Sequence, residues 1–324
     1  MRSAENRDQK ATIRTKHVLK RPVFDGILSM LHQIKKTVRT ATKLAGFDLH
    51  PYSMTNWKWG YGVDEYYPVD PKPRWGFGHP PHGKLAEVIE RGRADYASLI
   101  QAFSGCRDIY SKIPLTSDEL STTPNWQNVW FKDFDAVALI GILVARKPMR
   151  YFEIGSGNST KFARFAINDA KLQTTITSLD PNPRNSIDIL CDNVVRQRLE
   201  DCDLSLFDQL QAGDILFFDG SHRAFTNSDA TVFFLELLPR LASGVIVQIH
   251  DIFLPWDYPP RWNRRLYSEQ YLLAAMLLCQ QQPFKILLPN WFVEQDERLR
   301  AQAKEITKPL GCKSEGYSFW LETV

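Results

Sequence analysis

Several features that would indicate a common protein class are missing from this sequence of 324 residues. Its cysteines are odd in number and widely scattered, and none forms a C-x-x-C pair: Cys106, Cys191, Cys202, Cys279 and Cys312. A zinc knuckle or a disulfide framework is therefore not expected, and we expect reduced thiols. No apolar run reaches the roughly 18–20 residues that span a bilayer, and the N-terminus lacks the apolar core of a secretory signal. These absences favour a cytoplasmic protein.

Net charge is also small, at +3, which gives no reason to expect a nucleic-acid partner. The charge is uneven, because residues 1–45 hold eleven Lys and Arg against three acidic residues. Apolar residues recur at helical spacing between Phe24 and Leu44, with basic residues on the other faces. We expect a basic amphipathic helix over residues 23–45, either in peripheral contact with the inner face of the membrane or packed on the protein itself. Residues 1–20 are expected to be poorly ordered.

The segment 51–83 is rich in aromatic residues, proline and glycine, so it cannot form a regular helix or a central strand. It could line the rim of a substrate cleft or act as a strap that holds the N-terminal helix to the main domain. Helical spacing follows over 84–103 and 134–144. We therefore divide the chain into a basic tail and helix (1–45), an aromatic strap and helical extension (46–129) and a ligand-binding domain (130–324).

From Arg150 onward, short apolar runs alternate with helical patterns. The runs show little period-2 alternation, which is typical of strands buried on both faces of a parallel sheet: 151–154, 175–179, 215–218 and 245–249. Helices are predicted between them at about 159–170, 185–195 and 226–241. Two further runs, 285–288 and 317–321, predict closing strands that form an antiparallel edge pair. The pattern predicts a doubly wound α/β sheet whose ligand lies beyond the carboxyl ends of the strands.

The first of these strands runs directly into Gly155-Ser156-Gly157 and then into a helix. Two glycines permit a tight turn and close approach of a ligand to the backbone. Asp180 ends the next strand, where a carboxylate can accept the hydroxyls of a ribose. Thr160 stands where a dinucleotide fingerprint would have its third glycine, and Glu153 precedes the loop, where it would repel a pyrophosphate and favour a cation. A nicotinamide-binding fold stays an alternative at this point.

Two more pairs of polar residues follow neighbouring strands: Asp219 with His222, and His250 with Asp251. Both strand exits face one crevice in a parallel sheet, so the four side chains could converge there. A neutral imidazole is a competent base for a hydroxyl group. Alternatively, Asp219 caps the following helix and His250 is a core histidine that donates to the backbone.

These motifs resemble class I S-adenosylmethionine-dependent methyltransferases. Phe152 to Gly157 is similar to motif I of that family, Ser178-Leu179-Asp180 to motif II, and 214–222 and 243–251 to the fourth and fifth strands with their exits. The resemblance covers about 130–324 and implies a mostly parallel seven-stranded Rossmann-like sheet with an N-terminal helical or irregular extension. It implies a donor site at the following residues: Glu153, Gly155, Ser156, Gly157, Ser159, Asp180, Asp201 and Asp219.

Metal-dependent sugar and small-molecule O-methyltransferases of this fold hold Mg²⁺ on carboxylates at matching strand ends. The resemblance therefore suggests a metal site at Asp219, His250 and Asp251, although the family more often has two adjacent acids where His250 and Asp251 stand. An aromatic, proline- and arginine-rich loop over 253–265 could form a lid or an acceptor wall, or could pack against the strap.

Together these observations predict methyl transfer from S-adenosylmethionine to an oxygen of a small-molecule or glycan acceptor, such as a glycan, a lipid-linked sugar or a secondary metabolite. Asp219 and His222 are the predicted catalytic residues, with His222 as general base. The alternatives are a nicotinamide-dependent oxidoreductase and a non-catalytic scaffold for a membrane or a complex.

Overall fold

The computed structural model describes part of the chain in detail: residues 34, 37, 38, 40, 41, 71–118, 121–183, 187–281 and 283–324. The chain divides into two compact units, Met1–Asp64 and Glu65–Val324. In the first unit the five described residues are helical, and Ile34 and Val38 are exposed. The tail 1–20, most of the predicted helix 23–45 and residues 51–70 of the strap lie outside the described residues.

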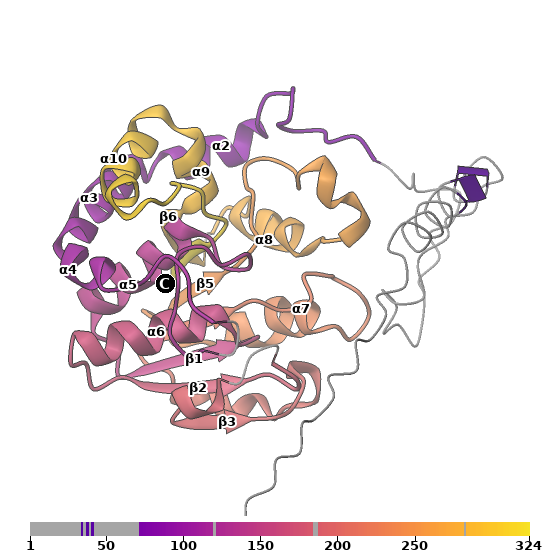
Figure 1. Ribbon diagram of the computed structural model, residues 1–324. Helices are drawn as coiled ribbons and strands as arrows, with labels where there is room; N and C mark the ends of the chain where they lie inside the picture. Colours follow the sequence, from indigo (N-terminus) through magenta and orange to yellow (C-terminus); the bar gives the residue numbers. More distant parts are fainter. Residues whose placement is uncertain are drawn as a thin grey trace, which may run out of the picture. The chain divides into compact units, whose positions relative to one another are not determined.

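The larger unit is built around a mostly parallel sheet (Figure 1). Within the described residues the sheet has seven strands in the order β3-β2-β1-β4-β5-β7-β6. The five parallel strands are β1 (Arg150–Ile154), β2 (Thr175–Leu179), β3 (Asn193–Val195), β4 (Ile215–Phe218) and β5 (Ile246–Ile249). β7 (Phe319–Thr323) is antiparallel to both of its neighbours, β5 and β6 (Phe284–Pro289). The predicted doubly wound sheet and its antiparallel closing strands are confirmed.

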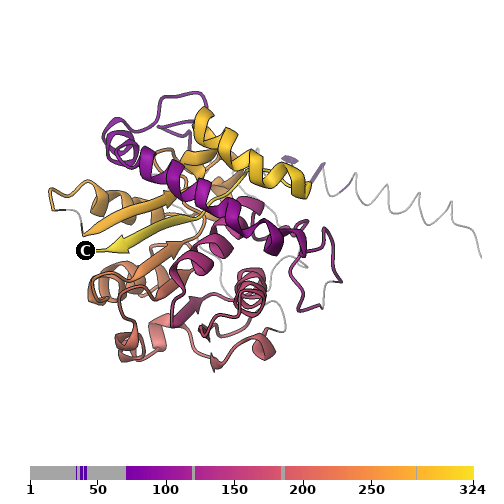
Figure 2. The same ribbon diagram turned by 90° about the vertical axis from the view of Figure 1, so that its left-hand side faces the viewer.

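Four helices pack together over the sheet: α3 (Arg93–Phe103), α5 (Asp133–Arg146), α6 (Asn158–Asp169) and α10 (Glu297–Thr307). Figure 2 shows α3 and α10 side by side in front of the strands. The strands β4 and β5 are buried along their whole length, which explains their apolar, non-alternating sequences. The predicted helix over 84–103 is two helices, α2 (Gly83–Glu90) and α3, with Gly92 at the boundary between them.

The predicted helix over 185–195 is wrong. A 3₁₀ turn at Asp188–Leu190 leads into β3, whose residues Val194 and Val195 pair with the edge of β2. Two adjacent β-branched residues suit a strand better than a helix, and this local preference outweighs the helical spacing of the preceding apolar residues. The predicted helix over 226–241 is interrupted: α7 (Asp229–Val232) continues as a π turn and ends in a 3₁₀ turn that contains Pro239.

The described part of the strap packs against the loop that follows β5. The backbone N–H groups of Arg74 and Trp75 donate to the Asp257 carboxylate, and the amide of Asn263 donates to the Pro71 carbonyl. Trp256 lies against Gly76 so closely that a Cβ atom there would meet the indole at 2.1 Å. These contacts support the alternative in which the loop after β5 packs against the strap.

In the described part of the chain, no helix is long and apolar enough to cross a membrane.

Candidate functional site

The loop after β1 approaches the exit of β4 through its backbone. Gly155 has a φ of 80°, and a Cβ atom at this position would lie 1.9 Å from the Asp219 carbonyl oxygen. Only glycine fits both the left-handed conformation and this close approach. The loop after β1 is therefore in close contact with the backbone at Asp219, where β4 ends.

Glu153 is buried at the end of β1 and is held by the chain itself. Thr160 donates a short hydrogen bond to its carboxylate, and the Tyr151 hydroxyl donates another at 3.2 Å. The Thr160 hydroxyl also accepts the Gly157 N–H at 3.0 Å. Thr160 therefore connects the strand end, the loop and the start of α6, which explains a threonine in place of a third glycine. Burial raises the pKa of Glu153 to about 7, against the opposing effect of its hydroxyl donors.

Asp180, at the end of β2, fixes the same loop from the other side. One of its carboxylate oxygens accepts the Ser156 N–H at 2.9 Å, and the other accepts the Asn182 N–H at 2.8 Å. The hydroxyls of Ser156 and Ser178 lie 2.6 Å apart. Each carboxylate oxygen has a second lone pair, so Asp180 can still accept hydroxyl groups from a ligand.

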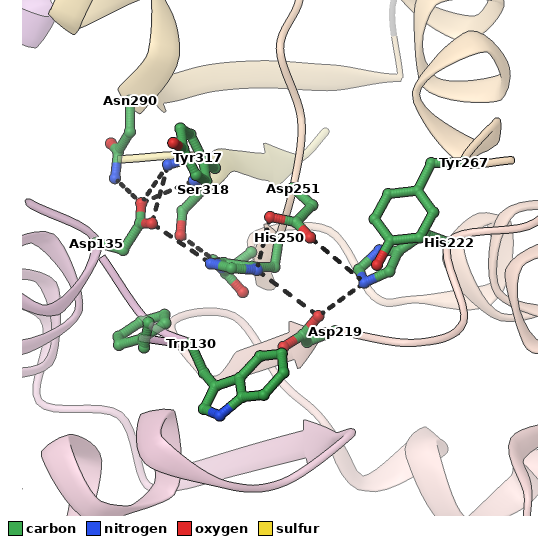
Figure 3. A network of polar contacts seen from close by, with 12 residues as sticks. Trp130, Asp135, Asp219, His222, His250, Asp251, Tyr267, Asn290, Tyr317 and Ser318 are labelled. Atoms are coloured by element: carbon green, nitrogen blue, oxygen red, sulfur yellow. Dashed lines mark hydrogen bonds and ion pairs between the residues drawn. The ribbon is translucent and has the colours of Figure 1, made fainter. Parts of the chain in front are cut away.

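The side chains after β4 and β5 converge, as predicted (Figure 3). His222 Nε2 lies 3.1 Å from Asp219 Oδ1 and 3.7 Å from Asp251 Oδ2. His250 Nδ1 lies 3.6 Å from the same Asp219 oxygen and 3.4 Å from Asp251 Oδ1. Asp219 is the accessible member, since its side chain is 34% exposed and that of His222 only 7%. His222 and Asp251 both adopt positive φ, at 62° and 57°, a backbone strain that is typical of functional sites.

Two further carboxylates complete this group, and the sequence interpretation missed both. Glu269, the fully buried first residue of α8 (Glu269–Leu277), places Oε1 2.8 Å from His222 Nδ1. Asp135 in α5 places Oδ2 3.4 Å from His250 Nε2. We call the chain of side chains from Asp135 through His250, Asp219 and His222 to Glu269, with Asp251 beside both histidines, the carboxylate–imidazole network.

Asp135 ties this network to the antiparallel strand. Its carboxylate accepts the backbone N–H groups of Tyr317 and Ser318 and the side-chain amide of Asn290, at 2.7–2.9 Å. The side chain is completely buried. Several N–H donors compensate a carboxylate for its burial, so Asp135 is held in a fixed position behind His250.

The carboxylates control the protonation of both imidazoles. Burial would lower the pKa of His222, but Glu269, Asp219 and Asp251 outweigh it and raise this pKa well above 6.5. The same balance, with Asp251 and Asp219 as the main partners, raises the pKa of His250. Burial would raise the pKa of Asp219, but the two imidazoles hold it well below its usual range. Burial raises the pKa of Glu269 more than His222 lowers it.

This geometry does not fit the suggested metal site at Asp219, His250 and Asp251. The Asp219 and Asp251 carboxylates each lie at ion-pair distance from imidazole nitrogens. Among the residues that the structure describes, no group of three or more His, Cys, Asp and Glu side chains is arranged to hold a metal ion. We therefore derive no role for Mg²⁺.

The other predicted residues lie as follows. Ser159 is buried at the start of α6. Asp201 lies in the 3₁₀ turn Leu199–Asp201, is about half exposed and pairs with Arg198 at 2.7 Å. In the loop after β5, Tyr258 and Trp262 are buried in an aromatic cluster with Phe253 and Tyr317, so these two rings do not form an open acceptor wall.

Comparison with known proteins agrees with the motifs. Residues 152–252 match the family model of a methyltransferase domain. The matched part makes up less than a third of the chain. It begins in β1 and includes the loop, both polar strand exits and Asp251. A search of curated proteins found no match.

Three quarters of the chain are also similar to solved structures. The SAH-bound methyltransferase PaMTH1 of Podospora anserina is 16% identical, with 74% of this chain and 96% of that chain covered and a TM-score of 0.36. The O-methyltransferase of Bacillus cereus in complex with SAH is 15% identical, with 75% and 96% covered and a TM-score of 0.35. The motifs and the strand order of the sheet resemble those of class I S-adenosylmethionine-dependent methyltransferases.

Proposed function

We propose that this chain transfers the methyl group of S-adenosylmethionine to an oxygen of its acceptor, with His222 as the general base. The oxygen attacks the methyl carbon in line with the sulfonium, the carbon–sulfur bond breaks, and S-adenosylhomocysteine leaves. The acceptor proton passes to His222 Nε2. The observation that carries this proposal is the position of His222 between Asp219 and Glu269 at the β4 exit, beside the loop of the methyltransferase domain.

Glu269 supports this role as a positioning residue. Its contact with Nδ1 fixes the ring so that Nε2 faces the Asp219 side of the site. Asp219 reaches the surface, so an acceptor hydroxyl can approach Nε2 along that carboxylate. Most of the acceleration would come from holding the two reactants in line, with proton removal supplying a further part.

The charge balance of the network suits a cationic donor. Four carboxyl groups (Asp135, Asp219, Asp251 and Glu269) surround only two imidazoles. Asp219 is the most exposed of the four, and the two imidazoles hold its pKa well below its usual range. Its negative charge favours a positive sulfonium over neutral S-adenosylhomocysteine. For the acceptor we propose a glycan, a lipid-linked sugar or a secondary metabolite with a free hydroxyl. The aromatic cluster after β5 would support the site from behind.

Ligand binding tests the donor. S-adenosylhomocysteine at a large excess over its Kd is expected to raise the melting temperature of the full chain by several degrees, because it binds only the folded state. NADH at the same concentration is expected to leave the melting temperature unchanged. A shift with NADH alone would favour the oxidoreductase alternative, and a shift with neither would favour a non-catalytic scaffold.

The pKa of His222 gives a second prediction. A base must be deprotonated, so the active form appears only as the pH rises through the raised pKa of His222, and methyl transfer falls as the pH falls through it. Glu269→Gln removes a carboxylate that raises this pKa, so the titration should move to lower pH. NMR titration of the His222 ring protons measures both values without any acceptor. An unchanged or higher pKa in the variant would contradict the role of Glu269.

A further inference from the structure

Two arginine side chains near the proposed base have no role in the scheme above. Arg223 directly follows His222 in the chain, and Arg265 is the last residue of the 3₁₀ segment Pro260–Arg265 in the loop after β5. The Arg223 Nε–H donates to the Arg265 carbonyl oxygen at 2.9 Å, so the two residues are also neighbours in space. Like charges repel each other, so this arrangement needs an explanation.

Tyr267 connects both guanidinium groups to His222. The centroids of the Tyr267 and His222 rings lie 4.3 Å apart, and Figure 3 shows one ring against the other. The guanidinium carbon of Arg223 lies 5.7 Å from the Tyr267 ring centroid, and that of Arg265 lies 5.4 Å from it. Neither guanidinium is therefore farther from the imidazole than two successive ring contacts. Burial raises the pKa of Asp251, and Arg265 is among the cations that oppose this rise, so its charge reaches the network.

Neither guanidinium group lies within ion-pair distance of a carboxylate in the described part of the chain. Arg223 donates to two backbone carbonyl oxygens, those of Ser221 and Arg265. Arg265 donates to the Tyr267 hydroxyl at 3.4 Å, which is a long contact. A guanidinium carries more N–H groups than these contacts use, so both side chains can still donate to a ligand.

The two side chains are also held in place before any ligand binds. The guanidinium carbon of Arg265 lies 4.0 Å from the ring centroid of Trp262, which is buried. Stacking of this kind uses the flat face of the guanidinium and leaves the N–H groups at its edge to meet oxygen atoms. Arg223 is partly buried, and its Nε contact fixes its direction. Two oriented guanidinium groups are well suited to phosphate and carboxylate, whose oxygens they can bind in pairs.

We propose that Arg223 and Arg265 bind an anionic group of the acceptor, a phosphate or a carboxylate, and thereby direct its hydroxyl toward His222. This inference rests on the proposed function. One small molecule can reach both places, because only the Tyr267 ring separates the arginines from the imidazole. The two positive charges also offset the repulsion that the carboxylates of the network exert on an anion. The inference favours a sugar phosphate or an acidic metabolite over a neutral glycan.

Anion binding tests the arginine pair without any acceptor. Inorganic phosphate and acetate are titrated separately into the full chain at constant ionic strength, and the His222 ring protons are followed by NMR. A saturable shift is expected with at least one of the two anions. The bound anion should also raise the pKa of His222, because it adds negative charge near the imidazole.

Variants then assign this binding to the two side chains. Arg223→Met and Arg265→Met keep most of each side chain's length and remove its charge, and each should weaken anion binding roughly 10- to 100-fold. Arg107→Met is the matched control, because it removes one charge from an exposed arginine of α4 (Arg107–Ser111). Figure 1 shows α4 well apart from α8. Anion binding in the control should equal that of the unmodified chain.

A transfer assay distinguishes the two sources of the anionic group. Radiolabelled methyl groups are transferred from S-adenosylmethionine into an extract of small molecules that has been treated beforehand. Phosphatase treatment should abolish the labelling of a phosphorylated acceptor, and amide coupling of carboxyl groups should abolish that of an acidic one. In either case Arg223→Met and Arg265→Met should raise the apparent KM for the labelled fraction and leave the affinity for S-adenosylhomocysteine within about twofold.

The absence of a saturable shift with both anions would overturn the inference. Equal weakening in Arg107→Met would overturn it too, because it would show general attraction by the net charge. Labelling that survives both treatments of the extract would exclude an anionic acceptor. If the chain binds anions at the arginine pair but does not bind S-adenosylhomocysteine, the proposed function itself fails, and this outcome differs from a failure of the pair. Circular dichroism of each variant confirms that the fold is retained.

Discussion

Replacing His222 with Asn is expected to reduce methyl transfer by about 10²- to 10⁴-fold and to leave the affinity for S-adenosylhomocysteine within about twofold. Asn is the informative substitution because His222 has a φ of 62°, a left-handed conformation that Asn tolerates better than most residues. Its amide can still hydrogen-bond to Glu269 or Asp219, yet it cannot take up a proton. The variant therefore removes the base while disturbing the buried carboxylates as little as the site allows.

The measurement is the transfer of radiolabelled methyl groups from S-adenosylmethionine into a fractionated extract of small molecules and glycans, with calorimetry of S-adenosylhomocysteine alongside. His79→Ala is a suitable control, because His79 is exposed and lies in the strap away from β4. Retention of full turnover in His222→Asn would exclude proton removal by this residue. A large loss of donor affinity would instead assign His222 to donor binding.

Asp135→Ala is expected to lower the free energy of unfolding by about 3–5 kcal/mol. The substitution leaves the N–H groups of Tyr317 and Ser318 buried without their acceptor, and it removes the carboxylate that faces the His250 imidazole. Each unsatisfied buried donor costs on the order of 1–3 kcal/mol, so several together produce a large effect.

Urea unfolding followed by circular dichroism measures this loss. Asp133→Ala is the matched control. Asp133 lies in the first turn of the same helix, is partly exposed and accepts the Lys313 N–H, so about 1 kcal/mol is expected. If the two variants lose equal stability, the buried carboxylate has no special part in joining α5 to β7. If Asp135→Ala is as stable as the unmodified chain, the hydrogen bonds that Asp135 accepts contribute nothing to the free energy of unfolding.

The local motifs allowed much of the fold and part of the site to be predicted. Strands buried on both faces produce apolar runs that sequence alone reveals, and Gly155 and Asp180 stand at fixed points relative to them. The convergence of Asp219, His222, His250 and Asp251 also follows from sequence, because neighbouring parallel strands end at the same edge of a sheet. These predictions needed only local pattern and general topology.

Glu269 and Asp135 could not be placed in the same way, because each meets its histidine only through tertiary structure. Glu269 lies 47 residues after His222 and, as the acidic first residue of an apolar helix, has an ordinary explanation in the helix dipole. Asp135 did carry a signal, since it is an acid near the start of a helix that is buried over most of its length. A carboxylate in such a helix needs a buried partner, but the sequence does not say which one.

The placement of β7 between β5 and β6 has a consequence for the order in which the protein is completed during synthesis. β6 has no neighbour in the sheet until residues 319–323 have been made, and β5 presents an unpaired edge until then. Tyr317 and Ser318, whose backbone N–H groups donate to Asp135, emerge from the ribosome just before β7. A nascent chain that stops short of this point would hold the loop after β1 but expose the edge of β5 and leave β6 unpaired, a template for aggregation. The same short segment therefore completes both the sheet and the donors that hold the polar network.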